Sequence, residues 1–411
     1  MTVHDRERRS GSAAGIGFYD HHDAELIGQD PFPLYAKYRQ ECPIGWSEKH
    51  GGFWVVAGRS EVDTIIHDPR KFSSYPVTLP PFPEQLGKMI PIEIDPPDHV
   101  GYRKILNAPF SPQQAKDLTG DMDRMMDDLI DQFIEDGHTD FAETVARPLP
   151  TMLAARILNL PLANGAKFQE WTDKIIHDSA NSPEIAGAAL AELYEFFGSY
   201  LNELRQQADP GGVLGALLKT EIDGQKFSDQ QLLDFCLILL IASIDTTQKA
   251  IGSILWYLAE HPDLRRQLCE NRSLIPSAVE EFLRYLSPVF VARTVTEDAE
   301  VGGKQLRKGD GCLLILPSAN RDESEFTDPD LFMPHRKPNR HLAFGANIHR
   351  CLGSHLARVE LRVMLDRVLD RIPDYELAPG QDVVWATGQV QGMVKVPVVF
   401  RAAQRKHAAT S

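Results

Sequence analysis

Cys351 is the residue whose surroundings most clearly predict chemistry. It stands in the segment 344–353, FGANIHRCLG, directly before apolar residues at helical spacing. A thiol at the start of a helix lies near the positive end of the helix dipole and near unpaired N–H groups, which favour the thiolate. His349 and Arg350 add donors and positive charge. The pattern suits a nucleophile, a redox thiol or an axial haem ligand, although a lone cysteine in a cytosolic chain is more often a buried structural residue.

A second group of polar side chains lies inside the most apolar stretch of the sequence. Residues 242–247, ASIDTT, bring a carboxylate and hydroxyls into a segment that is apolar on every side. Such groups are costly to bury without partners, so they indicate either a function or a threonine that bonds the carbonyl one turn back. We favour the functional interpretation.

Two further pairs have the spacing of helix neighbours. His99 and Arg103 are four residues apart on one helix face, where two donor side chains would attract an anion. Glu281 and Arg284 are three residues apart, a spacing at which surface ion pairs are common and contribute little. Neither pair identifies a site on its own.

Periodicity and turn signals predict the elements that would position these residues. A capping box, Ser228 with Gln231, starts a helix that should end at Glu260 before Pro262 and should span roughly 50 Å. Residues 76–97 hold seven prolines among apolar side chains and form either a core-covering loop or the wall of an apolar pocket. Other predicted elements are helices at 31–39 and 276–286, short strands at 44–47 and 53–57, and a hairpin at 388–394.

Composition limits the class of protein. The chain has 411 residues and a net charge of -15, which argues against nucleic acid as a partner. Its five cysteines are scattered and lack a CxxC pair, so we expect no disulfide framework and a cytoplasmic location. No signal peptide is evident, and the longest apolar run, 235–244, is too short to cross a membrane. We expect a monomer with one domain, 19–403, between loose tails at 1–18 and 404–411.

The segment around Cys351 resembles the haem-thiolate signature of the cytochrome P450 monooxygenases, Phe-Gly-x-Gly-x-His-x-Cys-x-Gly. It matches every fixed position except Asn347, and asparagine is the usual substitute for glycine in the left-handed conformation. The resemblance implies that Cys351 is the iron ligand of haem b. The segment ASIDTT is similar to the family's Ala-Gly-x-Asp-Thr-Thr, which implies that Thr246 hydrogen-bonds dioxygen and Asp245 relays protons. Ser243 replaces the family's glycine.

Further matches in the same order extend the resemblance over residues 95–360. The haem contacts that it implies are His99, Arg103, Arg293, Phe344, His349 and Gly353. The structural residues that would hold the cysteine loop are Glu281, Arg284 and Arg336. The implied fold is mainly α with a small β-region, flattened and triangular, with haem buried between the long central helix and the cysteine helix.

The resemblance also implies an activity and partners. The enzyme would activate dioxygen and hydroxylate a C–H bond. Electrons would come from NAD(P)H through a reductase and a ferredoxin or flavodoxin, because the chain has no flavin or iron–sulfur motif. A basic patch on the cysteine side would receive the electron donor. Its residues are Arg103, Lys104, Arg350, Arg358 and Arg362.

The residues expected to contact the substrate are almost all apolar, which predicts a neutral hydrophobic substrate of small or medium size. They are Leu79, Phe82, Ile90, Ser243, Val289, Phe290, Val291, Met393 and Val394. Residues 43–47 and 52–58 and the C-terminal hairpin are similar to those of soluble bacterial terpenoid hydroxylases of the cineole-oxidising kind. That similarity implies that the tip of the hairpin reaches into the pocket.

Three other interpretations remain open. The same fold could catalyse coupling, ring formation or desaturation in secondary metabolism. A haem protein without turnover, acting as a sensor or carrier, is disfavoured by the intact pair of Asp245 and Thr246. A thiol hydrolase or transferase would use Cys351 with His349, but two residues this close beside a helix start rarely reach the geometry of nucleophile and base.

Overall fold

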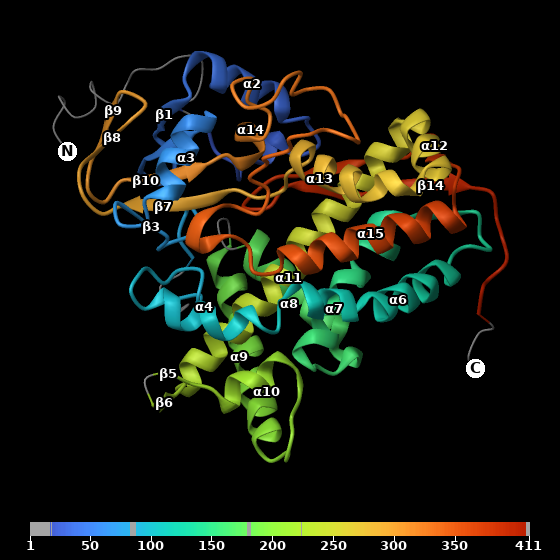
Figure 1. Cartoon of the computed structure of the whole chain (residues 1–411), viewed down its shortest axis with the longest axis horizontal. Coiled ribbons are helices and arrows are strands. Elements are labelled where there is room, and N and C mark those ends of the chain that lie inside the picture. The colour runs from blue at the N-terminus through green and yellow to red at the C-terminus, as the bar shows by residue number, and fades with distance from the viewer. Residues whose placement is uncertain (1–16, 18, 83–87, 179–181, 223, 408–411) are drawn as a thin grey trace.

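The computed structural model describes residues 17, 19–82, 88–178, 182–222 and 224–407. This part of the chain is mainly helical with small sheets, as predicted (Figure 1). The helices are α2 Phe32–Glu41, α3 Arg59–His67, α4 His99–Asn107, α5 Pro112–Asp117, α6 Thr119–Asp131, α7 Pro148–Leu158, α8 Gly165–His177, α9 Pro183–Arg205, α10 Gly212–Lys219, α11 Asp229–Glu260, α12 Pro262–Glu270, α13 Ile275–Tyr285, α14 Leu316–Ala319 and α15 Ser354–Arg371. The strands are β1 Ile44–Ser47, β2 Phe53–Val56, β3 Phe72–Ser73, β4 His138–Asp140, β5 Glu221–Ile222, β6 Gln225–Lys226, β7 Val291–Val295, β8 Ala299–Val301, β9 Lys304–Leu306, β10 Gly311–Leu314, β11 Tyr375–Leu377, β12 Val384–Ala386, β13 Gly392–Lys395 and β14 Pro397–Phe400.

Helix α11 runs through the middle of the fold and contacts α7, α8, α9 and α15 (Figure 1). The predicted capping box is present, because Ser228 Oγ accepts the Gln231 N–H while Gln231 Oε1 accepts the Ser228 N–H. Within the described residues α11 is the one helix long and apolar enough to cross a membrane, yet 78% of its most apolar window is buried in protein. Its apolar character is therefore that of a core helix.

A five-stranded sheet, in the order β1-β2-β10-β7-β3, joins the N-terminal part of the chain to the segment after α13. Strands β1 and β2 pair antiparallel, as the hairpin-like spacing predicted, and β2 pairs parallel with β10. Strand β7 pairs antiparallel with β10, which places Arg293 opposite Cys312. This pairing holds β7 at the edge of the central cavity described below.

The cysteine loop precedes α15 and turns through two left-handed residues. Gly345 has a φ of 62° and Asn347 a φ of 57°, so asparagine keeps the predicted turn in place of glycine. The Asn347 side chain donates to the carbonyl of His67 at 3.1 Å, and the Cys351 N–H donates to the carbonyl of Phe344 at 2.8 Å. Because α15 begins at Ser354, Cys351 stands before the helix rather than in its first turn.

Strands β12 and β13 form the predicted C-terminal hairpin, but its tip does not enter the cavity. Gln391 N–H donates to the carbonyl of Pro288 at 2.8 Å, and the Phe290 N–H donates to the carbonyl of Gln389 at 3.2 Å. The tip therefore packs behind the segment after α13. Strand β13 lies against α11 at Gly252, where a Cβ atom would stand 2.7 Å from the Met393 carbonyl oxygen, so the close approach requires glycine there.

The end of the described chain is attached to α6. Lys406 Nζ pairs with Asp127 at 2.7 Å, and Arg405 pairs with Glu135 at 3.1 Å. The Lys406 N–H donates to Asp131 at 2.9 Å. Residues 405–407 of the predicted C-terminal tail are thus held by ion pairs and hydrogen bonds, while residues 408–411 and nearly all of the predicted tail at 1–18 lie outside the described residues.

Candidate active site

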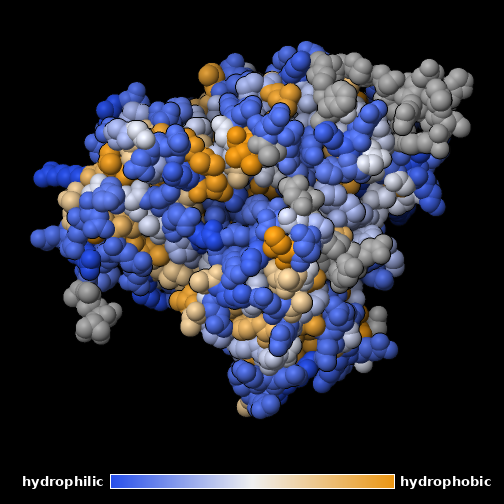
Figure 2. All heavy atoms as spheres, turned by 180° about the vertical axis from the view of Figure 1, so that it is seen from behind, coloured by the Kyte–Doolittle hydropathy of each residue, from blue (hydrophilic) through white to orange (hydrophobic). Residues whose placement is uncertain are grey.

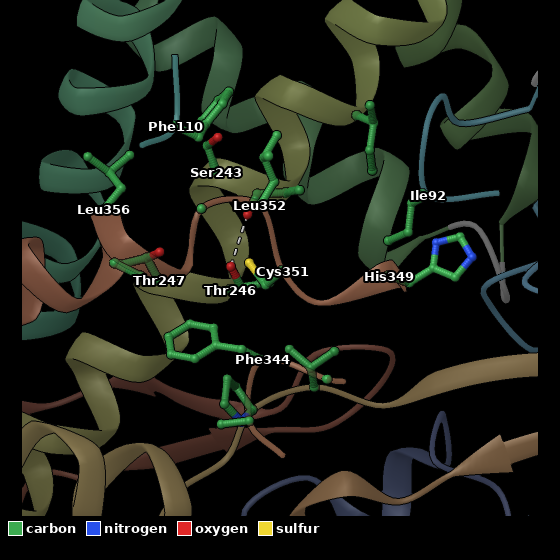
Figure 3. A pocket seen from close by; sticks show the side chains of 18 of the residues that line it. Ile92, Phe110, Ser243, Thr246, Thr247, Phe344, His349, Cys351, Leu352 and Leu356 are labelled. Atoms are coloured by element: carbon green, nitrogen blue, oxygen red, sulfur yellow. Dashed lines mark hydrogen bonds between the residues drawn. The ribbon is translucent and has the colours of Figure 1, made fainter. Parts of the chain in front are cut away.

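A cavity of about 270 Å³ lies between α11 and the cysteine loop (Figure 3). Cys351 enters it from the loop, and Ser243, Thr246 and Thr247 line it from α11 (Figure 3). Most of the described residues around it are apolar. The polar side chains that line it are His99, Arg103, Ser243, Thr246, Thr247, Arg293, His349, Cys351 and Glu360.

The Cys351 thiol is exposed to this cavity rather than to the outer surface. Burial by the surrounding protein raises the pKa of Cys351, while the Gly353 N–H and the nearby Arg103 and Arg350 lower it. Burial prevails, so the positive surroundings do not stabilise a thiolate by themselves, in contrast to our expectation. A metal cation bound to the sulfur would supply the missing stabilisation, because a coordinating thiol is deprotonated.

Four donor side chains gather at one part of the cavity wall, and we call them the cation cluster: His99, Arg103, Arg293 and His349. The two imidazoles lie 4.5 Å apart between ring centres. Burial, followed by Arg293 and His99, lowers the pKa of His349 to about 3, and burial lowers the pKa of Arg293 to about 10. The imidazoles are therefore neutral, and the positive charge of the cluster, carried by Arg103 and Arg293, would attract an anion.

Local contacts of the cation cluster leave capacity for such an anion. Arg293 Nη1 donates to the Ala292 carbonyl at 2.7 Å, and Arg103 donates to the Arg350 carbonyl. His349 Nε2 lies 3.1 Å from Ser74 Oγ. The Nε2 of His99 is buried and has no hydrogen-bond partner in the described structure. An unpartnered buried nitrogen beside two guanidinium groups is the donor set that binds carboxylates.

A haem fits these residues. Its propionates would lie at the cation cluster, Cys351 would face the iron, and the apolar wall, Phe344 included, would enclose the macrocycle. Gly353 also lines the cavity, and a Cβ atom there would stand 4.0 Å from the Cys351 sulfur, an ordinary contact distance.

Asp245 and Thr246 are neighbours in sequence but face different surroundings. Thr246 lines the cavity, and its hydroxyl donates to the Ala242 carbonyl at 2.9 Å. Asp245 is buried outside the cavity lining, where its Oδ1 lies 3.1 Å from His177 Nε2 and 3.3 Å from Lys249 Nζ. Burial raises the pKa of Asp245, but Lys249 and His177 outweigh burial and hold the pKa well below its ordinary value. Its Oδ2 has no partner in the described structure.

Ser243 stands where the family pattern has glycine, and it lines the cavity (Figure 3). Its hydroxyl donates to the Leu239 carbonyl one turn back at 2.6 Å. The same kind of bond occupies the Thr246 hydroxyl, so both side chains present mainly carbon to the cavity in this state. Compared with glycine, the Ser243 side chain therefore narrows the cavity beside α11 without adding an unpaired hydrogen-bond donor.

Glu281, Arg284 and Arg336 meet in a buried cluster beside the cysteine loop. Glu281 and Arg284 form two hydrogen bonds of 2.8 Å, and Arg336 Nε donates to Glu281 at 3.0 Å. Asn339 and the Met333 N–H also donate to this carboxylate, at 3.1 and 2.9 Å. All five donors converge on a side chain that is fully buried. The arrangement connects α13 to the segment that precedes the loop.

The structure divides the residues predicted to contact substrate. Ser243, Val289 and Val291 line the cavity. The described lining does not include Leu79, Phe82, Ile90, Phe290, Met393 or Val394. Phe290 points to the opposite side from its neighbours, as alternate residues of an extended chain do, and its ring contacts His21 and Tyr35.

The other departures have similar causes. Met393 is buried where β13 packs on α11, and its N–H bonds Ser253 Oγ at 3.1 Å. Leu79 lies beside Gly311 at the five-stranded sheet, and Ile90 is buried in the core around α8 and α9. In place of these residues, Val77, Pro91 and Ile92 of the proline-rich segment form that part of the wall, with Ile92 seen at its edge (Figure 3).

Two buried carboxylates near the cavity were not predicted. Glu360 of α15 lines the cavity with 2% of its surface exposed, and its Oε1 has no hydrogen-bond partner in the described structure. Burial raises the pKa of Glu360 to about 8. Glu93 lies behind the proline-rich wall with 4% exposed. Neither belongs to a recognisable motif. The one sequence signal of burial is that Glu360 lies on the apolar face of its helix.

Glu360 should make stability depend on pH. Its folded pKa of about 8 lies above the ordinary 4.5, so its contribution is greatest below pH 4.5 and is lost as the pH rises through 8. We expect the loss to be at most roughly 1.4 kcal/mol per pH unit in that window. Thermal unfolding at pH 5.5 and 8.5 should show a smaller difference for Glu360→Gln than for the wild type. Glu376→Gln, at an exposed position, should keep the wild-type difference.

The five basic residues predicted to receive an electron donor are not equally available. Lys104 and Arg350 are exposed. Arg358 is paired with Glu280 at 2.6 Å, and Arg103 lines the cavity. The face shown in Figure 2 is mostly hydrophilic, with apolar side chains in separate small patches.

Comparison with known proteins points to one family. The family model described as Cytochrome P450 matches residues 184–384. The steroid C26-monooxygenase of Mycolicibacterium smegmatis is 35% identical over 77% of this chain and 81% of its own length. The cytochrome P450 monooxygenase PikC of Streptomyces venezuelae is 32% identical over 92% of this chain and 94% of its own. The crystal structure of CYP109E1 from Bacillus megaterium in complex with testosterone has a TM-score of 0.84 at 31% identity and covers 90% of this chain and 98% of its own.

Proposed function

The chain belongs to the cytochrome P450 family and is a haem-dependent monooxygenase, and we propose that it hydroxylates a C–H bond of a neutral hydrophobic molecule. The composition of the cavity wall carries this proposal. Outside the cation cluster, Cys351 and Glu360, the polar side chains that line the cavity are three hydroxyl residues of α11. A wall of this kind binds a substrate by shape and apolar contact rather than by an ion pair.

Haem, when bound, supplies the iron chemistry that activates dioxygen. The chain's own residues hold and shield it. We propose that Cys351 ligates the metal and increases its electron density, and that His99, Arg103 and Arg293 bind the propionates. Phe344 and the apolar wall exclude water from the reacting centre. The buried contacts of Glu281 keep the cysteine loop in place.

Thr246 and Asp245 are proposed to deliver protons. Thr246 lines the cavity with its hydroxyl bonded to the Ala242 carbonyl, and Asp245 is joined to His177, whose side chain is 26% exposed. A proton can therefore pass from solvent to His177 and then to the buried Asp245. The step from Asp245 to the cavity requires a side-chain rotation that turns its unpartnered Oδ2 toward Thr246.

Asp245→Asn tests this role. We expect the rate of product formation to fall by about a hundredfold, the usual contribution of a positioned acid–base group, while ligand binding stays unchanged. Asp234→Asn is the matched control, because Asp234 is a carboxylate of the same helix that bonds Tyr194 and lies outside the cavity lining. Turnover should be measured with saturating substrate. Equal rates in the two variants would exclude Asp245 as the relay.

The substrate class is proposed from size and polarity. One relative is a steroid monooxygenase, and CYP109E1 was solved in complex with testosterone, so at least these two similar proteins bind large apolar molecules. The terpenoid substrate suggested by residues 43–47 and 52–58 is a narrower proposal of the same kind. Coupling, ring formation or desaturation on the same scaffold is the alternative reaction, and a non-catalytic haem sensor is the alternative function.

Members of this family receive electrons from redox partners. We propose a ferredoxin or flavodoxin that docks on the cysteine side, where Lys104 and Arg350 are exposed. We further propose a cytoplasmic monomer. Raising the ionic strength should slow reduction by an acidic partner, because the attraction between exposed charges is screened by salt.

The proposed function is tested by spectroscopy and product analysis. The reduced protein with carbon monoxide should show the red-shifted Soret band of thiolate ligation. Steroids and terpenoids should then be screened for a change in the haem spin state, and hits should be incubated with NADPH, a ferredoxin and its reductase. A monohydroxylated product supports the proposal. If the protein binds haem but consumes NADPH no faster than the ferredoxin and reductase alone, the result favours the sensor.

A further inference from the structure

Glu93 is a buried carboxylate whose hydrogen bonds, among the described residues, are all to backbone N–H groups of its own segment. Its Oε1 accepts the Val77 N–H at 2.9 Å, and its Oε2 accepts the Met89 N–H at 2.9 Å. The Glu93 N–H in turn donates to the carbonyl of Met89 at 3.0 Å. One side chain therefore joins both ends of the segment 77–89.

This segment is part of the cavity wall. Val77 at the start of the segment lines the cavity, as do Pro91 and Ile92 shortly after its end. Ile92 is visible at the cavity edge in Figure 3. The carbonyl of Val77 also accepts the Ala292 N–H at 2.8 Å. Since Val291 next to Ala292 lines the cavity too, Glu93 is connected through Val77 to the part of the wall that β7 contributes.

The described residues of this segment, 77–82 and 88–89, form few other backbone hydrogen bonds. Proline supplies no N–H, and the stretch contains Pro80, Pro81 and Pro91. Among the described residues 78–82 and 88, no backbone-to-backbone hydrogen bond is formed; the Leu79 carbonyl is bonded by the His22 side chain at 3.2 Å. The Glu93 carboxylate therefore accepts backbone N–H groups that neighbouring strands would pair in a β-sheet.

Burying a carboxylate is unfavourable, and this site offers only partial compensation. Burial raises the pKa of Glu93, while the N–H groups of Met89 and Val77 and the charge of Lys88 lower it. An apolar side chain at this buried position would avoid the cost of burying a charge. The two hydrogen bonds instead fix Val77 relative to Glu93 and so to its neighbour Ile92 in the cavity wall.

We propose that Glu93 is a positioning residue that sets the width of the substrate space by fixing Val77 against Ile92. The residue touches neither haem nor substrate and acts through these two wall residues. The inference rests on the proposed function of the cavity and adds to it a determinant of substrate size.

Glu93→Gln keeps the shape of the side chain but turns one acceptor into a donor that faces an N–H group. The segment should loosen, because a buried N–H then loses its acceptor. Two iron-binding probes of different size report on the wall: imidazole, which needs little room, and 4-phenylimidazole, which must fit against it. We expect the ratio of their dissociation constants to change about tenfold, the fold-change that corresponds to roughly 1.4 kcal/mol. The dissociation constant of imidazole should stay within about twofold of the wild-type value. The spectrum of the reduced, carbon monoxide-bound variant should match that of the wild type.

Asp322→Asn is the matched control. Asp322 also accepts one backbone N–H on each carboxylate oxygen, from Arg59 at 2.8 Å and from Ser324 at 2.9 Å, but it lies outside the cavity lining. This variant should lose stability and leave the ratio of the two constants unchanged. A ratio that shifts equally in both variants would mean that general loosening, not Glu93, changes the wall.

If Glu93→Gln does not bind haem, the ratio of the two dissociation constants is measured for Glu93→Asp instead. The shorter carboxylate keeps its charge and can reach only one of the two N–H groups, so it should give a smaller shift of the ratio. Loss of haem in both variants would make Glu93 a folding residue and overturn the proposal, as would an unchanged ratio. Failure of the proposed function can be told apart from failure of this inference. If the wild-type protein shows no thiolate ligation of haem, the proposed function is wrong before any Glu93 variant is made.

Discussion

Replacing Cys351 by serine abolishes turnover and the spectrum of thiolate ligation. We propose that the sulfur, which faces the cavity between α11 and α15, is the ligand through which the protein controls the electron density of the metal. A serine hydroxyl is a poorer donor and stays protonated more readily. We expect turnover to fall by at least about a thousandfold, roughly 4 kcal/mol of activation free energy. Haem content, the reduced carbon monoxide spectrum and product formation measure the effect.

Cys269→Ser is the control for this change. Cys269 is partly exposed on α12 and its sulfur lies 3.9 Å from the carbonyl oxygens of Leu369 and Pro373, outside the cavity lining. The same substitution there should leave the spectrum and the turnover unchanged. If Cys351→Ser retained the thiolate spectrum, another cysteine would have to be the ligand, and the proposed site would be wrong.

The parts of the fold that could be predicted have local signals. The start of α11 follows from Ser228 and Gln231, whose capping bonds involve residues three apart, and its end follows from Pro262. The left-handed turn at Asn347 is likewise a property of that residue in its own loop. The family pattern around Cys351 adds the position of the cavity, because it ties a loop and two helices to one cofactor.

The parts that could not be predicted depend on tertiary packing. Whether Phe290 or its neighbours face the cavity is decided by the register of an extended segment against the C-terminal hairpin, and a shift of one residue exchanges the two faces. Met393 is excluded from the cavity because β13 packs on α11 at Gly252. Neither contact leaves a pattern within a single stretch of sequence.

Charge partners show the same limit. Asp245 was predicted from its buried position, but its partner His177 is 68 residues earlier in the chain, at the end of α8. Nothing in the sequence near His177 marks it as a partner of Asp245. The motif therefore identified the carboxylate, while the direction in which it points, away from the cavity lining, required the structure.

Glu281→Gln is expected to destabilise the fold and to reduce haem binding. The change leaves Arg284 and Arg336 without the carboxylate that both contact, at a position with no exposed surface. Breaking a buried pair by removing one partner costs about 3–5 kcal/mol, because an uncompensated charge stays in the interior. The free energy of unfolding and the haem bound per chain should both fall, and the cysteine loop should exchange its amide hydrogens faster than in the wild type.

The adjacent Glu280→Gln provides a control one residue away on the same helix. Glu280 pairs with Arg358 at 2.6 Å and with His341 at 3.1 Å, but its side chain is 28% exposed, so water can replace the lost contacts. We expect a loss of about 1 kcal/mol or less and unchanged haem content. Since both variants remove one negative charge from α13, the difference between them isolates the burial of Glu281. A similar loss in both would mean that the charge of the helix, and not the buried contacts to Arg284 and Arg336, stabilises the cysteine loop.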